Sequence, residues 1–598
     1  MQQPSSGHEV NFALPRASER GRDHDSSRGG VLETSSLRHT GIAALALLAV
    51  SILTVLLVTA PPADAQTGET SRPWSPAAET QSVRILGIGE FTGAVSRPLG
   101  FQGELRDGSG NVQPVGGGPH LASTVAKLRA QAGGALLLAT GDSIGGTAPE
   151  TALLDDRPTI EFFNRIGVDG AGVGPRELEK GAEHIRALVR PECRTEQDCR
   201  MDPPLPPFRG AAFPFLASNV VPSPDAAPTF PFAIHRAGDV RVGVVAVTLP
   251  TGSVPDTPTE LADPLDAIDE TVESLQFLGV ETIVALVQAE PTHGNLAPGA
   301  CPDELTDHEL IRDLNPAVDA LIVGASGGPA TCRVLDPDSA ERVVVAPASH
   351  GRSVTVVDLA VDTSSGDVIR PQTSAFNQPV NLDIAPDPGT EELVRQATAA
   401  AAPAAREVVG SAAETIPRAM DEQGESALAN VVADAQLHAT REAGAQLALS
   451  NPDSIGADLP GGPLDYATLH AVQPYGDRLY LVTVTGEELR AAFDHLADDI
   501  GDHGPAVSSN VRYTVDTGLP EGARVAEVVI DDEPVDPRRD YTVVVNEFLA
   551  SPEWDGSVLA ERGERRESGL TDLAALLRYV ADEGPLSAPA AARVTVIR

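Results

Sequence analysis

The sequence predicts an α/β protein built from two layered domains. Its 598 residues are too many for one hydrophobic core, since a domain usually holds about 100–200 residues. Short apolar runs alternate with segments of helical period, which is typical of strands buried between layers of helices. A turn signal at Asp387-Pro388-Gly389 interrupts this alternation. We therefore expect an α/β domain over residues 82–385, a linker helix over 386–407 and a smaller α/β domain over 408–598.

The elements of the first domain follow from the spacing of its apolar residues. Runs rich in Val, Ile and Leu predict buried strands, and apolar positions at helical spacing predict helices. We expect helices over residues 121–131 and 266–278. The expected strands cover residues 83–88, 135–139, 241–247, 282–287 and 319–324.

The linker and the second domain differ in composition. Residues 390–406 are rich in Ala and carry several charged side chains, which suits an exposed helix between two domains. Apolar runs at 446–450, 479–484 and 541–546 predict strands of the second domain.

The chain before the first domain predicts export. Residues 1–40 are polar and lack apolar periodicity, so we expect them to be disordered. An apolar run over 41–60 is followed by Pro61-Pro62 and by Ala63-Asp64-Ala65. An apolar stretch that ends in such an Ala-x-Ala pattern is typical of a secretory signal.

Residues 41–65 can be interpreted in two ways. We favour a signal peptide over 41–65 that is cleaved after Ala65 and followed by a linker over 66–81. Because about 20 apolar residues can cross a bilayer, an uncleaved membrane anchor is the alternative. Both place the domains outside the cytoplasm, either secreted or held at the membrane by this segment alone.

The charge excludes one class of partner. The formal net charge is −42, and Lys127 and Lys180 are the only lysines. An acidic surface repels phosphate backbones, so we expect no nucleic-acid partner. It also does not steer anionic nucleotides inward, so a nucleotide site would depend on local geometry.

Four cysteines fit an extracytoplasmic location. Cys193 and Cys199 flank a short polar loop, and Cys301 and Cys332 bracket a region with a predicted strand. Local pairing costs the least loop-closure entropy, so we expect the disulfides Cys193–Cys199 and Cys301–Cys332. A zinc site is the weaker alternative because no Cys-x-x-Cys spacing occurs.

The second domain carries a series of short motifs. They are Glu425–Asn430 with Asp434, Asn451–Leu459, Gln473–Asp477, Thr485–Leu489, Val507–Tyr513, and Asn546–Ala550 with Asp555-Gly556. In this order they resemble the opening helix, the substrate loops and the final binding loop of the C-terminal domain of 5′-nucleotidases and periplasmic UDP-sugar hydrolases.

This resemblance implies a site for a nucleotide or nucleoside. The family holds the base between two aromatic rings, and such stacking stabilises the complex by about 1–3 kcal/mol per base. The ring positions fall on Tyr475 and Phe548, with Asp555 as a polar contact; the alternative is that both rings are ordinary core residues. The family's substrate-gripping Arg is replaced by Gly456, which removes a guanidinium fork.

The first domain carries a second series of motifs. They are Gly87–Gly93, Gly141–Ser143, Thr159–Asn164, Gly174–Glu177, Phe213–Asn219, Leu286–Gln288 and Gly324–Gly327. Their order resembles the calcineurin-like metallophosphatase domain of the same family. The resemblance covers nearly the whole chain from Val83 and implies a four-layer α/β sandwich with a dinuclear metal cleft.

Most ligands of that cleft are replaced in this sequence. The resemblance places the bridging carboxylate on Asp142, and Glu90 stands in for a second acid. Arg176 occupies the position of the catalytic His. The other ligand positions hold Thr92, Pro175, Gln288, Ala325 and Gly327. Because two carboxylates cannot hold two divalent ions, we expect no metal pair.

Two further expectations concern this cleft. Arg176 and Asp142 could form an ion pair where the metals would lie. His293 and His350 are close in sequence to the affected loops, and we expect both to face solvent rather than to replace the lost imidazoles.

These observations predict an exported 5′-nucleotidase-like pseudoenzyme that binds a nucleotide or nucleoside. One alternative is an active phosphoesterase with a rearranged pair of Mn, Zn or Mg ions. A second alternative is a surface interaction protein. No organic cofactor is expected, since the sequence has neither a dinucleotide fingerprint nor a P-loop.

Overall fold

The computed structural model describes residues 80–107, 109–190, 205–223, 228–249, 260–288, 299–324, 328–421, 424–499, 505–550, 559, 564–589 and 592–597. The predicted segments 1–40 and 41–65, and the linker up to residue 79, lie outside these residues. All contacts described below lie within Ser75–Arg598, which forms one compact unit.

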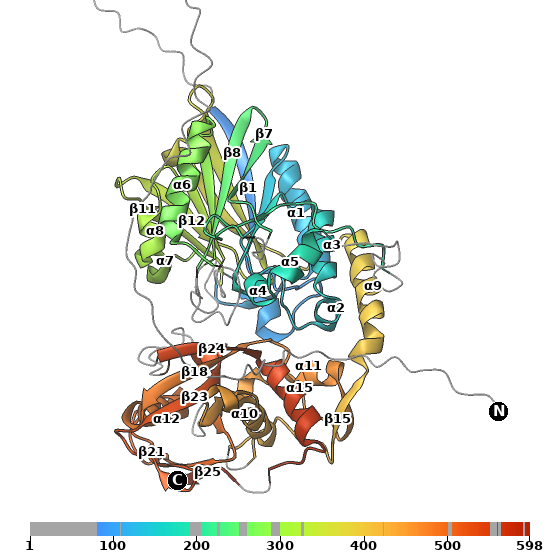
Figure 1. Ribbon diagram of the computed structural model, residues 1–598, viewed down its shortest axis with the longest axis vertical. Coiled ribbons are helices and arrows are strands. Elements are labelled where there is room, and N and C mark those ends of the chain that lie inside the picture. Colours follow the sequence, from blue (N-terminus) through green and yellow to red (C-terminus); the bar gives the residue numbers. More distant parts are fainter. Residues whose placement is uncertain are drawn as a thin grey trace, which may run out of the picture. The chain divides into compact units, whose positions relative to one another are not determined.

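Two six-stranded sheets form the N-terminal lobe, by which we mean the elements from β1 to β14 (Figure 1). The first sheet has the order β14 (Ser374–Pro379), β13 (Ser353–Asp362), β1 (Thr80–Ile88), β4 (Leu136–Ala139), β5 (Gly170–Gly172) and β6 (Phe215–Leu216). The second has the order β11 (Ala330–Leu335), β12 (Glu341–Ala346), β10 (Ala320–Gly324), β9 (Thr282–Gln288), β8 (Val240–Thr248) and β7 (Phe232–Ala237). A small hairpin pairs β2 (Glu104–Arg106) with β3 (Val112–Pro114).

Helices cover the outer face of each sheet, so this lobe has four layers (Figure 1). Neighbouring strand residues point to opposite faces. Ile85 therefore packs against the second sheet, while Leu86 packs under the helices. On the first sheet lie α1 (Gly118–Ala132), α3 (Arg157–Ile166) and α5 (Ala182–Val189); on the second lie α6 (Pro264–Phe277) and α8 (Glu309–Asp313). Short helices are α2 (Pro149–Ala152), α4 (Pro175–Glu179) and α7 (Asp303–Asp307). The predicted four-layer sandwich is confirmed.

The strands at the centre of each sheet are parallel. β1 pairs in parallel with β4, and β9 pairs in parallel with both β8 and β10. The carboxyl ends of parallel strands share one edge, which is where α/β proteins place their sites. Glu90, Asp142 and Gln288 lie at or just beyond the ends of β1, β4 and β9.

The predicted linker helix is α9 (Pro388–Ala405). The Asp387 carboxylate caps its first turn by accepting from the Thr390 nitrogen at 2.7 Å. Leu393 and Ala397 bury one face of α9 in the core of the N-terminal lobe.

The C-terminal lobe, from β15 onward, is a smaller α/β assembly, as predicted (Figure 1). Its five-stranded sheet has the order β19 (Ala506–Val507), β16 (Leu447–Ser450), β23 (Asp540–Asn546), β18 (Arg478–Thr485) and β24 (Glu564–Thr571). A four-stranded sheet has the order β22 (Glu533–Pro534), β21 (Val525–Ile530), β20 (Val511–Asp516) and β25 (Val594–Ile597), and β15 (Val408–Ala412) pairs with β17 (Gly462–Asp465). The helices are α10 (Ala427–Thr440), α11 (Tyr466–Val472), α12 (Gly486–Asp499), α13 (Glu547–Ala550) and α15 (Asp572–Glu583).

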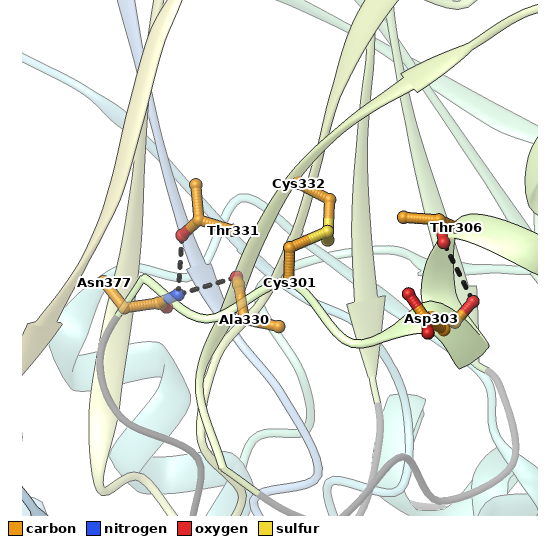
Figure 2. Close-up of a disulfide and its surroundings, with 7 residues drawn as sticks. All are labelled: Cys301, Asp303, Thr306, Ala330, Thr331, Cys332 and Asn377. Carbon is orange, nitrogen blue, oxygen red and sulfur yellow. Dashed lines mark hydrogen bonds between the residues drawn. A yellow bond between two sulfur atoms is a disulfide. The ribbon is translucent and has the colours of Figure 1, made fainter.

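A disulfide joins Cys301 to Cys332, as predicted (Figure 2). Their Cα atoms are 5.1 Å apart, within the usual range for a disulfide. Beside it, the Asn377 amide donates to the Ala330 carbonyl at 2.9 Å, which fixes the same edge of β11. The predicted bridge between Cys193 and Cys199 lies outside the described residues.

Candidate functional site

Asp142 lies in a loop that two glycines hold against the loop after β5. Its own φ is 48°, and the φ of Gly141 is 145°. A Cβ atom on Gly141 would stand 2.9 Å from the Gly174 nitrogen, and one on Gly174 would overlap the Asp142 carboxylate. A side chain at either glycine would therefore push the two loops apart.

The buried carboxylate of Glu177 ties these two loops together. It accepts hydrogen bonds from the backbone nitrogens of Asp142 at 2.8 Å, Ser143 at 2.7 Å and Gly174 at 2.8 Å. Burial raises the pKa of Glu177 to about 8, and the nearby charge of Asp142 acts in the same direction. Glu177 thus sets the position of Asp142 through the backbone.

The side-chain amide of Gln288 lies between the two surviving carboxylates. Its Nε2 atom donates to Glu90 Oε1 at 2.8 Å and lies 3.5 Å from Asp142 Oδ2. Glu90 and Gln288 are both buried. An amide group with two donors therefore occupies the space between acids that resemble metal ligands.

The guanidinium of Arg478, on β18, reaches the same carboxylate from the C-terminal lobe. Its Nη2 atom is 3.5 Å from Asp142 Oδ2 and 3.4 Å from Glu179 Oε1, and its Nε atom is 3.4 Å from Glu567 Oε1. Burial alone lowers the pKa of Arg478, but these carboxylates outweigh burial and hold its pKa well above the ordinary value. Arg478 is therefore a permanent cation at Asp142.

Arg176 meets Asp142 differently from our expectation. Its backbone nitrogen donates to Asp142 Oδ1 at 2.8 Å. Its guanidinium turns away and lies 3.9 Å from Glu547 Oε2 and 3.5 Å from the Gly145 carbonyl. The expected ion pair at Asp142 is therefore made by Arg478 and not by Arg176.

His350 is half-buried beside the network of Glu90, Asp142, Gln288 and Arg478, so the expectation that it faces solvent was wrong. Its backbone nitrogen donates to the Glu90 carbonyl at 2.8 Å, and its Nδ1 lies 3.0 Å from Ser349 Oγ. Burial lowers the pKa of His350 well below its usual value, and the charges of Arg352 and Arg176 lower it further. His293 and residues 325–327 lie outside the described residues.

The described residues do not fit a metal pair. Among them, no group of three or more His, Cys, Asp or Glu side chains is placed to hold a metal ion. The carboxylates of Glu90 and Asp142 already contact the Gln288 amide, and Asp142 also faces Arg478. A cation shared by these carboxylates would have to compete with these nitrogens for the same oxygens.

A small cavity, here called the Tyr475 pocket, opens next to this network. Its volume is about 230 Å³. The predicted base-stacking residue Tyr475 forms one wall, and Arg176 and His350 reach it from the N-terminal lobe. Its other lining residues include Arg97, Leu99, Thr147, Glu150, His470 and Pro474.

Tyr475 packs against a ring that the sequence did not single out, and the two ring planes are tilted by 37°. The ring centroids of Tyr475 and Phe101 are 4.6 Å apart, and Gln102 donates to the Tyr475 carbonyl at 3.3 Å. Phe548 lies on α13, a short helix where a loop was expected, and is 38% exposed. Asp555 lies outside the described residues, so the sandwich of Tyr475 and Phe548 stays a prediction.

Three charged residues of the network were missed by sequence reasoning. Glu179 and Glu567 lie in none of the motifs, and only the folding of the chain brings them together. Arg478 had a usable signal, because it is a cation at the start of the apolar strand Leu479–Val484. An Arg that is buried with its strand needs an acidic partner for its charge.

Comparisons with known proteins agree with this architecture. Residues 408–561 match the family model of the 5′-nucleotidase C-terminal domain. The chain is similar to the endonuclease YhcR of Bacillus subtilis, with 24% identity over 83% of the chain and 39% of YhcR. It is also similar to the cell wall protein Lmo0130 of Listeria monocytogenes, with 25% identity over 79% of the chain and 64% of Lmo0130. The chain thus spans less than two thirds of either relative.

A solved structure shares the fold. The 5′-nucleotidase precursor of Thermus thermophilus superposes with a TM-score of 0.53 at 23% identity, covering 86% of this chain and 99% of that one. In the part of the chain that the structure describes, no helix is both long and apolar enough to span a membrane.

Proposed function

We propose that this chain, which belongs to the 5′-nucleotidase family through its C-terminal domain, is a binding protein that has given up hydrolysis. Its relatives include 5′-nucleotidases, whose family role is to cleave nucleotide phosphate esters. The proposal is that the two-lobed scaffold is kept while the metal chemistry is lost.

One observation carries the proposal. Asp142, the position of the bridging ligand, faces two protein nitrogens at 3.5 Å, the Gln288 amide and the Arg478 guanidinium. A divalent ion would have to displace both and lie close to a permanent positive charge. Two like charges in a buried site repel strongly, which opposes metal binding.

The position of the catalytic His, which transfers a proton in the family, is also changed in this chain. A catalytic His can carry a proton near neutral pH, whereas Arg stays charged. Arg176 takes that position by the family resemblance, and its guanidinium points to Glu547. It therefore supplies neither a metal ligand nor a general acid.

The ligand that we propose is a nucleotide or nucleoside held by the C-terminal lobe. Tyr475 and Phe548 would provide the aromatic faces and Asp555 a polar contact. Location outside the cytoplasm is part of the same proposal, because it agrees with the apolar segment before residue 66 and with the cell-wall relative.

Metal analysis combined with phosphate release tests the loss of hydrolysis. Purified protein is dialysed against Mn²⁺, its metal content is measured, and AMP and UDP-glucose are offered as substrates. We expect far less than one metal ion per chain and no phosphate release above the buffer rate. Two bound ions with turnover, abolished by Asp142→Ala, would establish the active phosphoesterase instead.

A further inference from the structure

The loop Arg97–Gly103 connects the N-terminal lobe to the ring of Tyr475. The Phe101 ring packs against the Tyr475 ring, with 4.6 Å between their centroids, and the Gln102 side chain donates to the Tyr475 carbonyl at 3.3 Å. A Cβ atom on Gly100, whose φ is 56°, would stand 2.6 Å from the Tyr475 hydroxyl, so this close approach requires glycine. The Tyr475 pocket therefore has walls from both lobes.

Arg97 lines this pocket and has no acidic partner among the described residues. Its Nε atom donates to the Val115 carbonyl at 3.3 Å, and its Nη2 atom donates to the Gly103 carbonyl at 3.0 Å. Both acceptors are neutral, so these bonds orient the guanidinium without cancelling its charge. Because a guanidinium has five N–H donors and Arg97 is exposed, donors remain that a ligand can reach.

The other charged groups of the pocket do not cancel the charge of Arg97. The Arg176 guanidinium is turned toward Glu547, 3.9 Å away. Burial lowers the pKa of His470, and the charge of Glu150 opposes this, which places Glu150 near His470. Among the described residues, no ion pair joins Glu150 to either arginine. The positive charge of Arg97 is therefore available to a ligand.

An anionic ligand of this chain needs a local cation. The net charge of −42 does not attract anions from a distance. The resemblance places the family's substrate-gripping Arg at Gly456, where a Cβ atom would stand 2.6 Å from the Ala471 carbonyl and 3.0 Å from Pro474 Cγ. Because these contacts leave no room for a side chain, a guanidinium near Tyr475 has to come from another segment. Arg97 lines the same pocket as Pro474 and Tyr475.

We propose that Arg97 binds the anionic group of a ligand whose base stacks on Tyr475, so that the pocket prefers a nucleoside phosphate to a nucleoside. This inference rests on the proposed stacking at Tyr475 and not on the loss of hydrolysis. A guanidinium can donate two parallel hydrogen bonds to a phosphate, and such charge-assisted bonds are about twice as strong as neutral ones. The N-terminal lobe thus supplies a residue that sets ligand specificity.

Isothermal titration calorimetry of the full chain with adenosine, AMP and inorganic phosphate tests the proposal. EDTA in the buffer prevents metal-dependent hydrolysis. We expect AMP to bind about tenfold more tightly than adenosine, and phosphate, which cannot stack, to bind more weakly than AMP. Equal affinities for AMP and adenosine would overturn the assignment of Arg97 and leave the proposed base site intact. No binding of either ligand would overturn both.

Variants of Arg97 then locate the anionic group. Arg97→Gln removes the charge, so AMP affinity should fall about tenfold, while adenosine affinity should stay within about twofold because Tyr475 is unchanged. Arg97→Lys keeps the charge without the planar fork and should keep part of the preference for AMP. Arg106→Gln is the matched control, because Arg106 is exposed on β2 and donates to the Gly110 carbonyl at 3.3 Å.

Three outcomes with these variants would contradict the proposal. The preference for AMP could survive Arg97→Gln, or it could fall equally in Arg106→Gln, which would indicate a general effect of charge. Adenosine affinity could also fall as much as AMP affinity in Arg97→Gln, which would mean that Arg97 only supports the loop.

Discussion

The Asp142 cleft and the Tyr475 pocket lie next to each other but differ in how their buried carboxylates are paired. At Asp142 the chain supplies its own cation, because Arg478 lies among Asp142, Glu179 and Glu567. In the pocket, Glu150 is buried and no described residue pairs with it. A cleft can therefore keep the backbone shape of its family while its side chains no longer suit the chemistry of that family. We propose that the cleft keeps the outline of a metal site but binds no metal, whereas the pocket keeps Tyr475, the proposed stacking residue.

The largest change in stability is expected when the buried cation Arg478 is removed. Arg478→Ala leaves three carboxylates facing one another without a positive charge, so the free energy of unfolding should fall by about 3–5 kcal/mol. Urea unfolding at neutral pH measures this. Arg395→Ala is a matched control, since the Arg395–Glu392 pair is exposed and should contribute less than about 1 kcal/mol. Equal losses in both variants would show that the Arg478 cluster does not stabilise the fold.

A second test tries to make the cleft a metal site again. In the double variant Arg478→Ala, Gln288→Glu, both nitrogens are gone and a third carboxylate joins Glu90 and Asp142. We expect Mn²⁺ to stabilise this variant, by about 2.7 kcal/mol at a concentration roughly one hundred times its Kd. The wild-type protein should gain nothing under the same conditions. Thermal unfolding with and without Mn²⁺ gives both values, and a gain for the wild type would contradict the account.

The third test uses the acid response of His350, which borders both regions. Its pKa in the folded protein is depressed, so the unfolded chain takes up a proton that the folded protein does not. Stability should therefore fall as pH drops below about 6.5, by at most about 1.4 kcal/mol per pH unit. His350→Asn removes this response and tolerates the φ of 58°. The loss of stability between neutral and lower pH should be smaller in the variant than in the wild type, and burial of His235 and His470, whose pKa values are also lowered, accounts for what is left. An unchanged pH slope would mean that His350 is not the cause.

The smallest effect concerns Glu150 without ligand. Glu150→Gln removes a buried charge that no described residue pairs with, so the protein should become more stable by about 0.5–1 kcal/mol. This sign is opposite to that of Arg478→Ala, although both variants remove a charge. Glu183→Gln should leave stability unchanged, since the Glu183 side chain is 93% exposed. A loss of stability in Glu150→Gln would mean that its carboxylate already has a favourable environment.

Much of the fold could be predicted because it depends on local patterns. Apolar runs at 282–287 and 319–324 became β9 and β10, and the Ala-rich segment 390–406 became α9. The Cys301–Cys332 bridge followed from loop length. These features need only the sequence near them, so periodicity and loop entropy are sufficient.

The site could be predicted only in part, because its contacts join distant segments. The sequence showed Gln288 and Arg176 at positions where the family that it resembles has imidazoles, but it did not show which residues contact Asp142. Arg478 is more than 300 residues from Asp142 in the chain, and no local pattern links them. The contact of Phe101 with Tyr475 and the partial burial of His350 depend in the same way on the packing of separate loops.

The most direct measurement is an anomalous difference map from crystals soaked in Mn²⁺. We expect no peak near Asp142, with the Arg478 guanidinium and the Gln288 amide in place. A peak at coordination distance from the Asp142 carboxylate, with Arg478 displaced, would contradict this expectation.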